Sequence, residues 1–215
     1  MWRGIGVVLL AVTTLAAPGS AGSTGQADDA CPTGTAHVVL DPGHGGSDPG
    51  ALNSTYGLSE KSVNLEVAQR AAAILQGTYG YRVALTRNDD EKELGNAQRG
   101  AIANACDALV FVEIHMNASF DPSVDYTQTF WGEKEKDLAF SQTMLRALGA
   151  LGIPTAEVDR FDNGGLLRAR MPSVLVEAVF LSNMDEAKDL ANGSRQEGIS
   201  QAVAAGVNAW IQRQA

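Results

Sequence analysis

The sequence has little positive charge for its length. Lysine and arginine total 16 against 25 aspartates and glutamates, which gives a formal net charge of −9 in 215 residues. This balance argues against non-specific attachment to nucleic acid or to an anionic membrane surface, so no nucleic-acid partner is expected. Internal repeats are also missing, and with 45% hydrophobic residues the chain is expected to fold as one domain. A specific site for an uncharged or zwitterionic substrate is still allowed.

Long apolar runs are missing too, except for a short one at the N-terminus. Arg3 precedes an apolar stretch over residues 4–17, and small residues follow at 18–22. This pattern predicts a secretory signal peptide over residues 1–22; the alternative is an uncleaved membrane anchor. Residues 23–30 form a polar linker, so the folded domain is expected over residues 31–215, with no membrane span after signal removal.

The rest of the chain alternates between strand and helix patterns. Alternation of this kind predicts a single α/β domain with a mostly parallel, twisted sheet covered by helices on both faces. The strands are expected at residues 37–40, 81–86, 108–115, 126–131 and 172–179, and the helices at 59–76, 96–105, 136–148 and from 194 onwards.

Polar residues gather where the predicted strands end, which is where ligands collect in parallel sheets. His44 lies in a glycine-rich turn after the first strand, His115 ends a central strand, and Glu60 opens the helix that follows the turn. Two imidazoles and one carboxylate, with a position left for water, form the ligand set of a catalytic zinc site. Glu177 interrupts an apolar strand, where an unpaired carboxylate is costly, and could supply the proton acceptor.

Each candidate has a simpler explanation. A histidine that closes a strand is often a hydrogen-bonded structural residue, and we interpret His37, the third histidine, in this way. Glu60 could be a favourable acid at a helix N-terminus. Glu66 is a rival ligand, although it falls on the other face of the same helix.

The two cysteines, Cys31 and Cys106, precede the two strands that end near His44 and His115. If these strands run parallel and their histidines meet at one end, the cysteines lie close together at the other end. We therefore predict a disulfide between them; the alternative is two unrelated buried thiols.

Several motifs in order resemble the zinc-dependent N-acetylmuramoyl-L-alanine amidases of the amidase_3 type. They are Leu40-Asp41-Pro42-Gly43-His44-Gly45-Gly46, Glu60, Thr86-Arg87, Arg99 with Ala103-Asn104, Ile114-His115-Met116-Asn117, and Pro172 to Glu177 with Phe180-Leu181-Ser182-Asn183. The resemblance extends from His37 to the last helix.

The resemblance implies a site, a reaction and a compartment. His44, Glu60 and His115 would hold one zinc ion, and Glu177 would be the catalytic acid/base. The implied reaction is hydrolysis of the amide between the lactyl group of N-acetylmuramic acid and L-alanine, by a zinc-activated water. Peptidoglycan or muropeptides would be the substrate of a monomer secreted into the periplasm or cell-wall space of a bacterium. Asn117 is a further candidate beside the zinc.

Two departures from the family pattern bear on the site. Glu113 stands where a serine is usual, on the same strand face as His115. It could accept a hydrogen bond from that imidazole, compete for the metal, or pair with Arg87 or Arg99, which are themselves candidates for supporting the site or contacting substrate. The family usually has Leu-Gly after the residue equivalent to Glu177, whereas this chain has Ala178-Val179. This change removes the glycine on which the usual backbone conformation at that strand end depends.

Two other classes of function remain open on the sequence. The same ligands would serve a secreted zinc peptidase with another amide substrate, and the two departures allow an inactive amidase-like regulator. No second domain for gripping the cell wall is visible, and the connection from His115 to Phe130 is short. We therefore expect a small, constitutively open enzyme.

Overall fold

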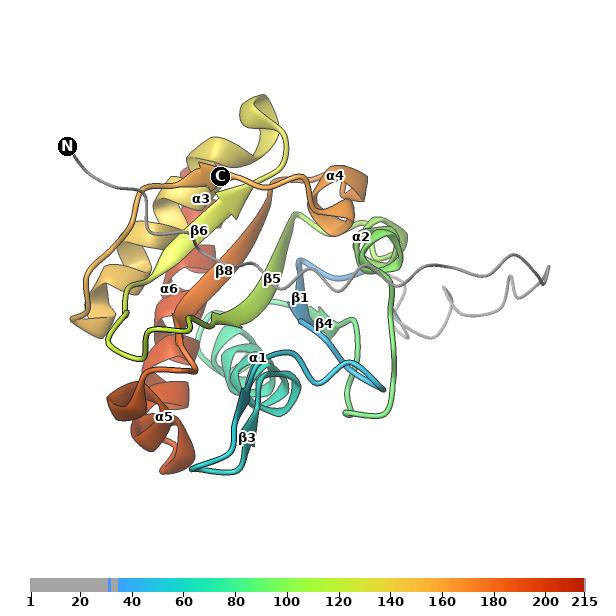
Figure 1. Ribbon diagram of the computed structural model, residues 1–215. Helices are drawn as coiled ribbons and strands as arrows, with labels where there is room; N and C mark the ends of the chain where they lie inside the picture. The colour runs from blue at the N-terminus through green and yellow to red at the C-terminus, as the bar shows by residue number, and fades with distance from the viewer. Residues whose placement is uncertain (1–30, 32–34, 215) are drawn as a thin grey trace.

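The computed structural model describes Cys31 and residues 35–214. The predicted signal peptide and linker, residues 1–30, lie outside the described residues. The described chain folds into a six-stranded sheet in the order β4-β1-β5-β8-β6-β7, with a separate two-stranded hairpin, β2-β3 (Figure 1). The strands are β1 (Val38–Pro42), β2 (Leu52–Asn53), β3 (Leu58–Ser59), β4 (Val83–Leu85), β5 (Val110–Asn117), β6 (Gln128–Trp131), β7 (Asp159–Arg160) and β8 (Ser173–Phe180).

The sheet is mostly parallel, as predicted. β1 pairs in parallel with β4 and β5, and β5 pairs in parallel with β8. The exception is β6, which runs antiparallel to β8. Because β1, β5 and β8 are neighbours with one direction, their carboxyl ends meet at one edge of the sheet.

Helices cover both faces of the sheet, which confirms the predicted fold class (Figure 1). One face carries the main core, where Val38, Val112 and Ile114 pack against the apolar sides of α1, α3 and α6. Val39 and Phe111 point the other way, towards Ile102 of α2. The helices are α1 (Glu60–Gly77), α2 (Asn96–Ala105), α3 (Lys134–Leu148), α4 (Gly164–Arg168), α5 (Met184–Ala191) and α6 (Ser194–Gln214), with a 3₁₀ turn, η1, at Gly149–Leu151. None of the helices between residues 35 and 214 is long and apolar enough to cross a membrane.

The predicted elements differ from the observed ones mainly at their ends. α2 has the predicted bounds, while α1 includes Gly77 and is capped at Thr78. β5 continues through His115 to Asn117, so that histidine lies inside the strand. The sequence did not predict the two-residue strands, α4 or α5. Segments of two to five residues hold too few side chains to show a period, and the eight residues of α5 span only about two turns.

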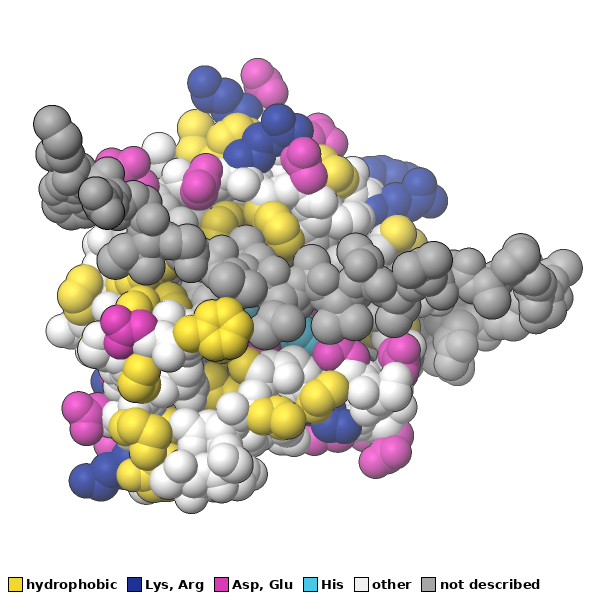
Figure 2. Space-filling view, in the orientation of Figure 1, with side chains coloured by type: hydrophobic (Ala, Val, Ile, Leu, Met, Phe, Trp, Pro, Cys, Tyr) yellow, Lys and Arg dark blue, Asp and Glu magenta, His cyan; other side chains and the backbone are white. Residues whose placement is uncertain are grey.

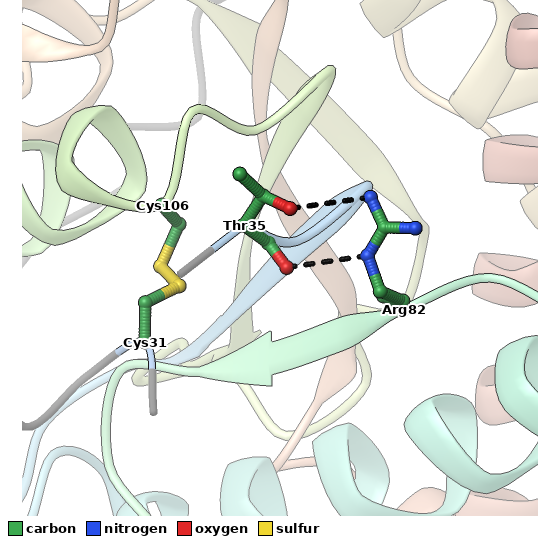
Figure 3. Close-up of a disulfide and its surroundings, with 4 residues drawn as sticks. All are labelled: Cys31, Thr35, Arg82 and Cys106. Atoms are coloured by element: carbon green, nitrogen blue, oxygen red, sulfur yellow. Dashed lines mark hydrogen bonds between the residues drawn. A yellow bond between two sulfur atoms is a disulfide. The ribbon is translucent and has the colours of Figure 1, made fainter. Parts of the chain in front are cut away.

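The predicted disulfide joins Cys31 to Cys106, with 5.4 Å between their Cα atoms (Figure 3). Beside it, Arg82 donates from Nε to the carbonyl of Thr35 and from Nη2 to its hydroxyl, both at 3.3 Å. The crosslink lies at the amino ends of β1 and β5, opposite the carboxyl ends that carry the histidines.

Removing the crosslink is expected to lower stability without altering the site. Replacing both Cys31 and Cys106 by alanine should reduce the free energy of unfolding by about 2–4 kcal/mol, because the unfolded chain regains the freedom that a 75-residue loop closure removes. Urea denaturation measures this change. Adding reductant to the wild-type protein should reproduce it, and equal stability of variant and wild type would contradict the expectation.

Candidate metal centre

Three side chains from separate elements meet at the carboxyl edge of the sheet. His44 follows β1, Glu60 is the first residue of α1, and His115 lies in β5. Glu60 Oε1 is 2.9 Å from His44 Nε2 and 3.0 Å from His115 Nδ1. One donor atom from each residue lies within 4.8 Å of the others. The structure therefore brings together the three residues that the sequence suggested.

The donors suit the metal that the sequence suggested. Two imidazole nitrogens and a carboxylate oxygen around one point are the three protein ligands of many catalytic zinc sites. The side chains of His44 and His115 are 20% and 16% exposed, so solvent can reach the centre. Histidine surface is visible near the middle of the face in Figure 2, with acidic side chains beside it.

Glu60 is held in place by backbone amides as well as by the imidazoles. Its Oε2 accepts from the amide of Ala51 at 2.9 Å, and its Oε1 accepts from the amide of Met116 at 3.1 Å. Burial would raise the pKa of the Glu60 carboxyl, but hydrogen bonds from His115 and His44 outweigh it and hold the pKa well below its usual range. Glu66, the rival ligand, pairs instead with Arg70 at 2.6 Å.

His44 is fixed by a carboxylate that the sequence reasoning missed. Asp48 Oδ2 lies 2.8 Å from His44 Nδ1 and Glu60 Oε1 lies 2.9 Å from Nε2, so a carboxylate faces each nitrogen of the ring and fixes its orientation. Burial lowers the pKa of His44, whereas hydrogen bonds and charge from Glu60 and Asp48 raise it, and the net shift is upward. The available signal was a carboxylate four residues after a histidine within one tight turn.

The glycines around His44 make room for the site itself. A Cβ on Gly43 would lie 2.2 Å from the His115 ring, and one on Gly50 would lie 2.5 Å from Glu60 Oε2. The missing side chains let the candidate ligands pack directly against the backbone of the turn.

Glu177 lies directly opposite His115 in the pairing of β5 with β8. The side chain is buried, and its Oε2 has no hydrogen-bond partner in the described chain. Burial and the nearby charge of Glu60 raise the pKa of the Glu177 carboxyl well above its usual value. The register between the strands shifts just after this pair, so Ala178 and Val179 form an irregularity. Neither has a positive φ, so this backbone does not require glycine.

Among the described residues, Glu113 makes no hydrogen bond to His115 and no ion pair with Arg87 or Arg99. Glu60 occupies the Nδ1 side of His115, and among the described residues Arg99 pairs with Asp41 rather than with Glu113. The Glu113 carboxyl is buried against Gly165, where a Cβ would lie 2.0 Å from its Oε1. Burial and the neighbouring charge of Asp41 raise the pKa of the Glu113 carboxyl well above its usual value.

Of the other candidates, Asn117 lies on the same strand as His115. It lies two residues beyond His115 on the same strand face, and its Oδ1 accepts from the amide of Ala118 at 2.8 Å. Arg87 and Arg99 are buried and donate to the backbone of the His44 turn, so neither is placed to contact substrate.

Fold and site together define a single-domain α/β protein with a two-histidine, one-glutamate centre at the carboxyl edge of its sheet. The profile of the Amidase_3 family, described as N-acetylmuramoyl-L-alanine amidase, matches residues 38–209. The chain belongs to this family.

Individual relatives agree with this assignment. The chain is 33% identical over 220 residues to the N-acetylmuramoyl-L-alanine amidase AmiC of Neisseria meningitidis, covering 81% of this chain and 52% of that protein. It thus spans about half the length of that relative. The catalytic domain of the amidase CwlV from Bacillus (Paenibacillus) polymyxa superposes with a TM-score of 0.76 at 31% identity, covering 81% of this chain and 97% of that one. AmiC2 of Nostoc punctiforme also gives a TM-score of 0.76 at 31% identity, with coverage of 82% and 97%.

Proposed function

We propose that the protein hydrolyses the amide bond between the lactyl group of N-acetylmuramic acid and L-alanine in peptidoglycan stem peptides. The observation that carries the proposal is the buried Glu177 carboxyl facing His115, beside the cluster of His44, Glu60 and His115. Membership of the amidase family supplies the choice of substrate.

One zinc ion would be held by His44 Nε2, Glu60 Oε1 and His115 Nδ1. A zinc ion bound there would lower the pKa of water from about 15.7 towards about 7 and would polarise the substrate carbonyl. Asp48, which contacts Nδ1 of His44, would keep the proton on that nitrogen and leave Nε2 available. Glu60 contributes negative charge because its pKa is low.

Glu177 would move the proton during the reaction. As a buried carboxylate with an unpartnered oxygen, it can accept the proton from the attacking water and then deliver it to the leaving amine of L-alanine. Its raised pKa suits both steps, because a carboxyl that binds its proton more firmly is a stronger base. Asn117 is the nearest candidate for contacting substrate.

We also propose an exported, monomeric enzyme. Residues 1–22 would be the signal and residues 23–30 the linker, and the disulfide suits an oxidising compartment such as the periplasm or cell-wall space. Ten residues without a helix connect β5 to β6, which supports an active site that is open without an activating partner. Slow turnover that rises sharply when a partner is added would contradict this.

A comparison of two substrates tests the reaction. The zinc-loaded protein is expected to release L-alanine-terminated peptide from a muramyl peptide, and to leave the same peptide without its muramyl group uncut. Mass spectrometry of the products locates the broken bond. Equal cleavage of the plain peptide would favour a general zinc peptidase, and no cleavage of either substrate would favour a regulator without catalytic activity.

A further inference from the structure

Two buried arginines bind three consecutive carbonyls of the turn that carries His44. Arg87 donates from Nε to the carbonyl of Pro42 and from Nη2 to that of Gly43, both at 2.9 Å. Arg99 donates from Nη1 to the carbonyl of Pro42 at 3.1 Å and from Nη2 to that of His44 at 2.8 Å. We call these two side chains the arginine clamp.

The clamp acts where the backbone is strained. His44 has φ of 62°, a left-handed conformation that is unfavourable for a residue with a Cβ. Such a conformation persists only when surrounding contacts impose it. The His44 carbonyl itself accepts the hydrogen bond from Arg99 Nη2, so this contact bears directly on the conformation.

Both guanidinium groups are fixed by further contacts. Arg99 pairs with the buried Asp41 at 2.9 Å. Arg87 is fully buried and donates to the carbonyl of Lys61 at 2.7 Å and to Asp90 Oδ1 at 2.9 Å. A planar guanidinium can reach several acceptors at once, whereas a lysine ammonium acts as a single point charge.

We propose that Arg99, supported by Arg87, is a positioning residue for the metal centre, which sets zinc affinity by holding His44 in its left-handed conformation. This inference rests on the proposed zinc site. Neither arginine touches the donor atoms; the effect passes through the backbone of the turn to the imidazole. Asp48 orients the same imidazole through its ring, so His44 is held at both ends.

Arg99→Lys tests the proposal because it keeps the positive charge beside Asp41 and loses the fork that reaches the His44 carbonyl. The dissociation constant for zinc, measured by chelator competition, is expected to rise by about 10- to 100-fold, the range for groups that support metal ligands indirectly.

Arg195→Lys is the matched control. Arg195 also pairs with a carboxylate, Glu186, and donates to a backbone carbonyl, that of Leu151, but on α6 and away from the site. Its zinc affinity should stay within about twofold of wild type.

A second measurement needs no metal. The amide of Gly45 donates to the carbonyl of Asp48, and that of Gly46 donates to the carbonyl of Asp90. Arg99→Lys should speed hydrogen exchange at both amides by about tenfold or more, while Leu109, at the opposite end of the sheet, exchanges as in wild type. A folded Arg99→Lys protein with wild-type zinc affinity and wild-type exchange at Gly45 would overturn the inference. Failure of the wild-type protein to bind zinc would instead overturn the proposed function.

Discussion

Glu177→Gln is expected to abolish most muramyl-peptide hydrolysis while leaving zinc bound. Glutamine keeps the size of the side chain but cannot accept and return a proton, and loss of a general acid/base costs about 10²- to 10⁴-fold in rate. The change should appear in kcat, measured at saturating substrate. Zinc content should remain near one equivalent, because Glu177 lies beside the three donor residues rather than among them.

Glu186→Gln provides the matched control for this variant. Glu186 is another buried glutamate, and burial raises its pKa to about 7, but it pairs with Arg195 on the α5–α6 side of the molecule. Its replacement should leave kcat within about twofold of wild type. Substantial hydrolysis by Glu177→Gln would remove Glu177 from the proposed role, and loss of zinc would move it into the metal centre.

His44→Ala is expected to lose the metal. Removing one of three protein ligands should lower the zinc content of purified protein from about one equivalent to less than about a tenth, and hydrolysis should disappear with it. The fold should survive, because the turn lies at the edge of the sheet and outside the main core. Metal analysis and thermal unfolding of the zinc-free protein measure the two effects separately.

His37→Ala shows whether the loss is specific to the site. This histidine accepts a hydrogen bond from the amide of Arg82 and stacks edge-on against Tyr81, at the end of the sheet away from the metal centre. The His37→Ala variant should retain zinc and activity. If His44→Ala also kept a full equivalent of zinc, the proposed ligand set would be wrong.

The fold class and the meeting of the candidate ligands at one edge of the sheet could be predicted, because each depends on a pattern that is visible in a short stretch of sequence. Strands alternating with helices fix a parallel sheet, and a parallel sheet brings the ends of β1 and β5 together with whatever residues they carry. His44 and His115 could therefore be paired without any knowledge of distances. Glu177 stood out because a carboxylate inside an apolar strand needs a reason.

Other parts of the site left no such signal. The arginine clamp depends on the side chains of Arg87 and Arg99, which contact backbone carbonyls 44 or more residues earlier in the chain. Its acceptors are backbone carbonyls, which every residue has. The surroundings of Glu113 depend on Asn163 and Gly165 around the start of α4, a helix too short to show a period.

The positions of the site residues along the chain also decide when the site can form during folding. The site residues are spread along the chain: His44 follows β1, Glu60 begins α1, His115 lies in β5 and Glu177 lies in β8. In sequence order, β8 is the last strand of the sheet. Contacts between residues so far apart in sequence form slowly, after much of the chain entropy has been lost. Under the proposed roles, the three metal ligands lie within residues 44–115, whereas turnover also needs residue 177, so hydrolysis can return during refolding only once β8 has paired with β5.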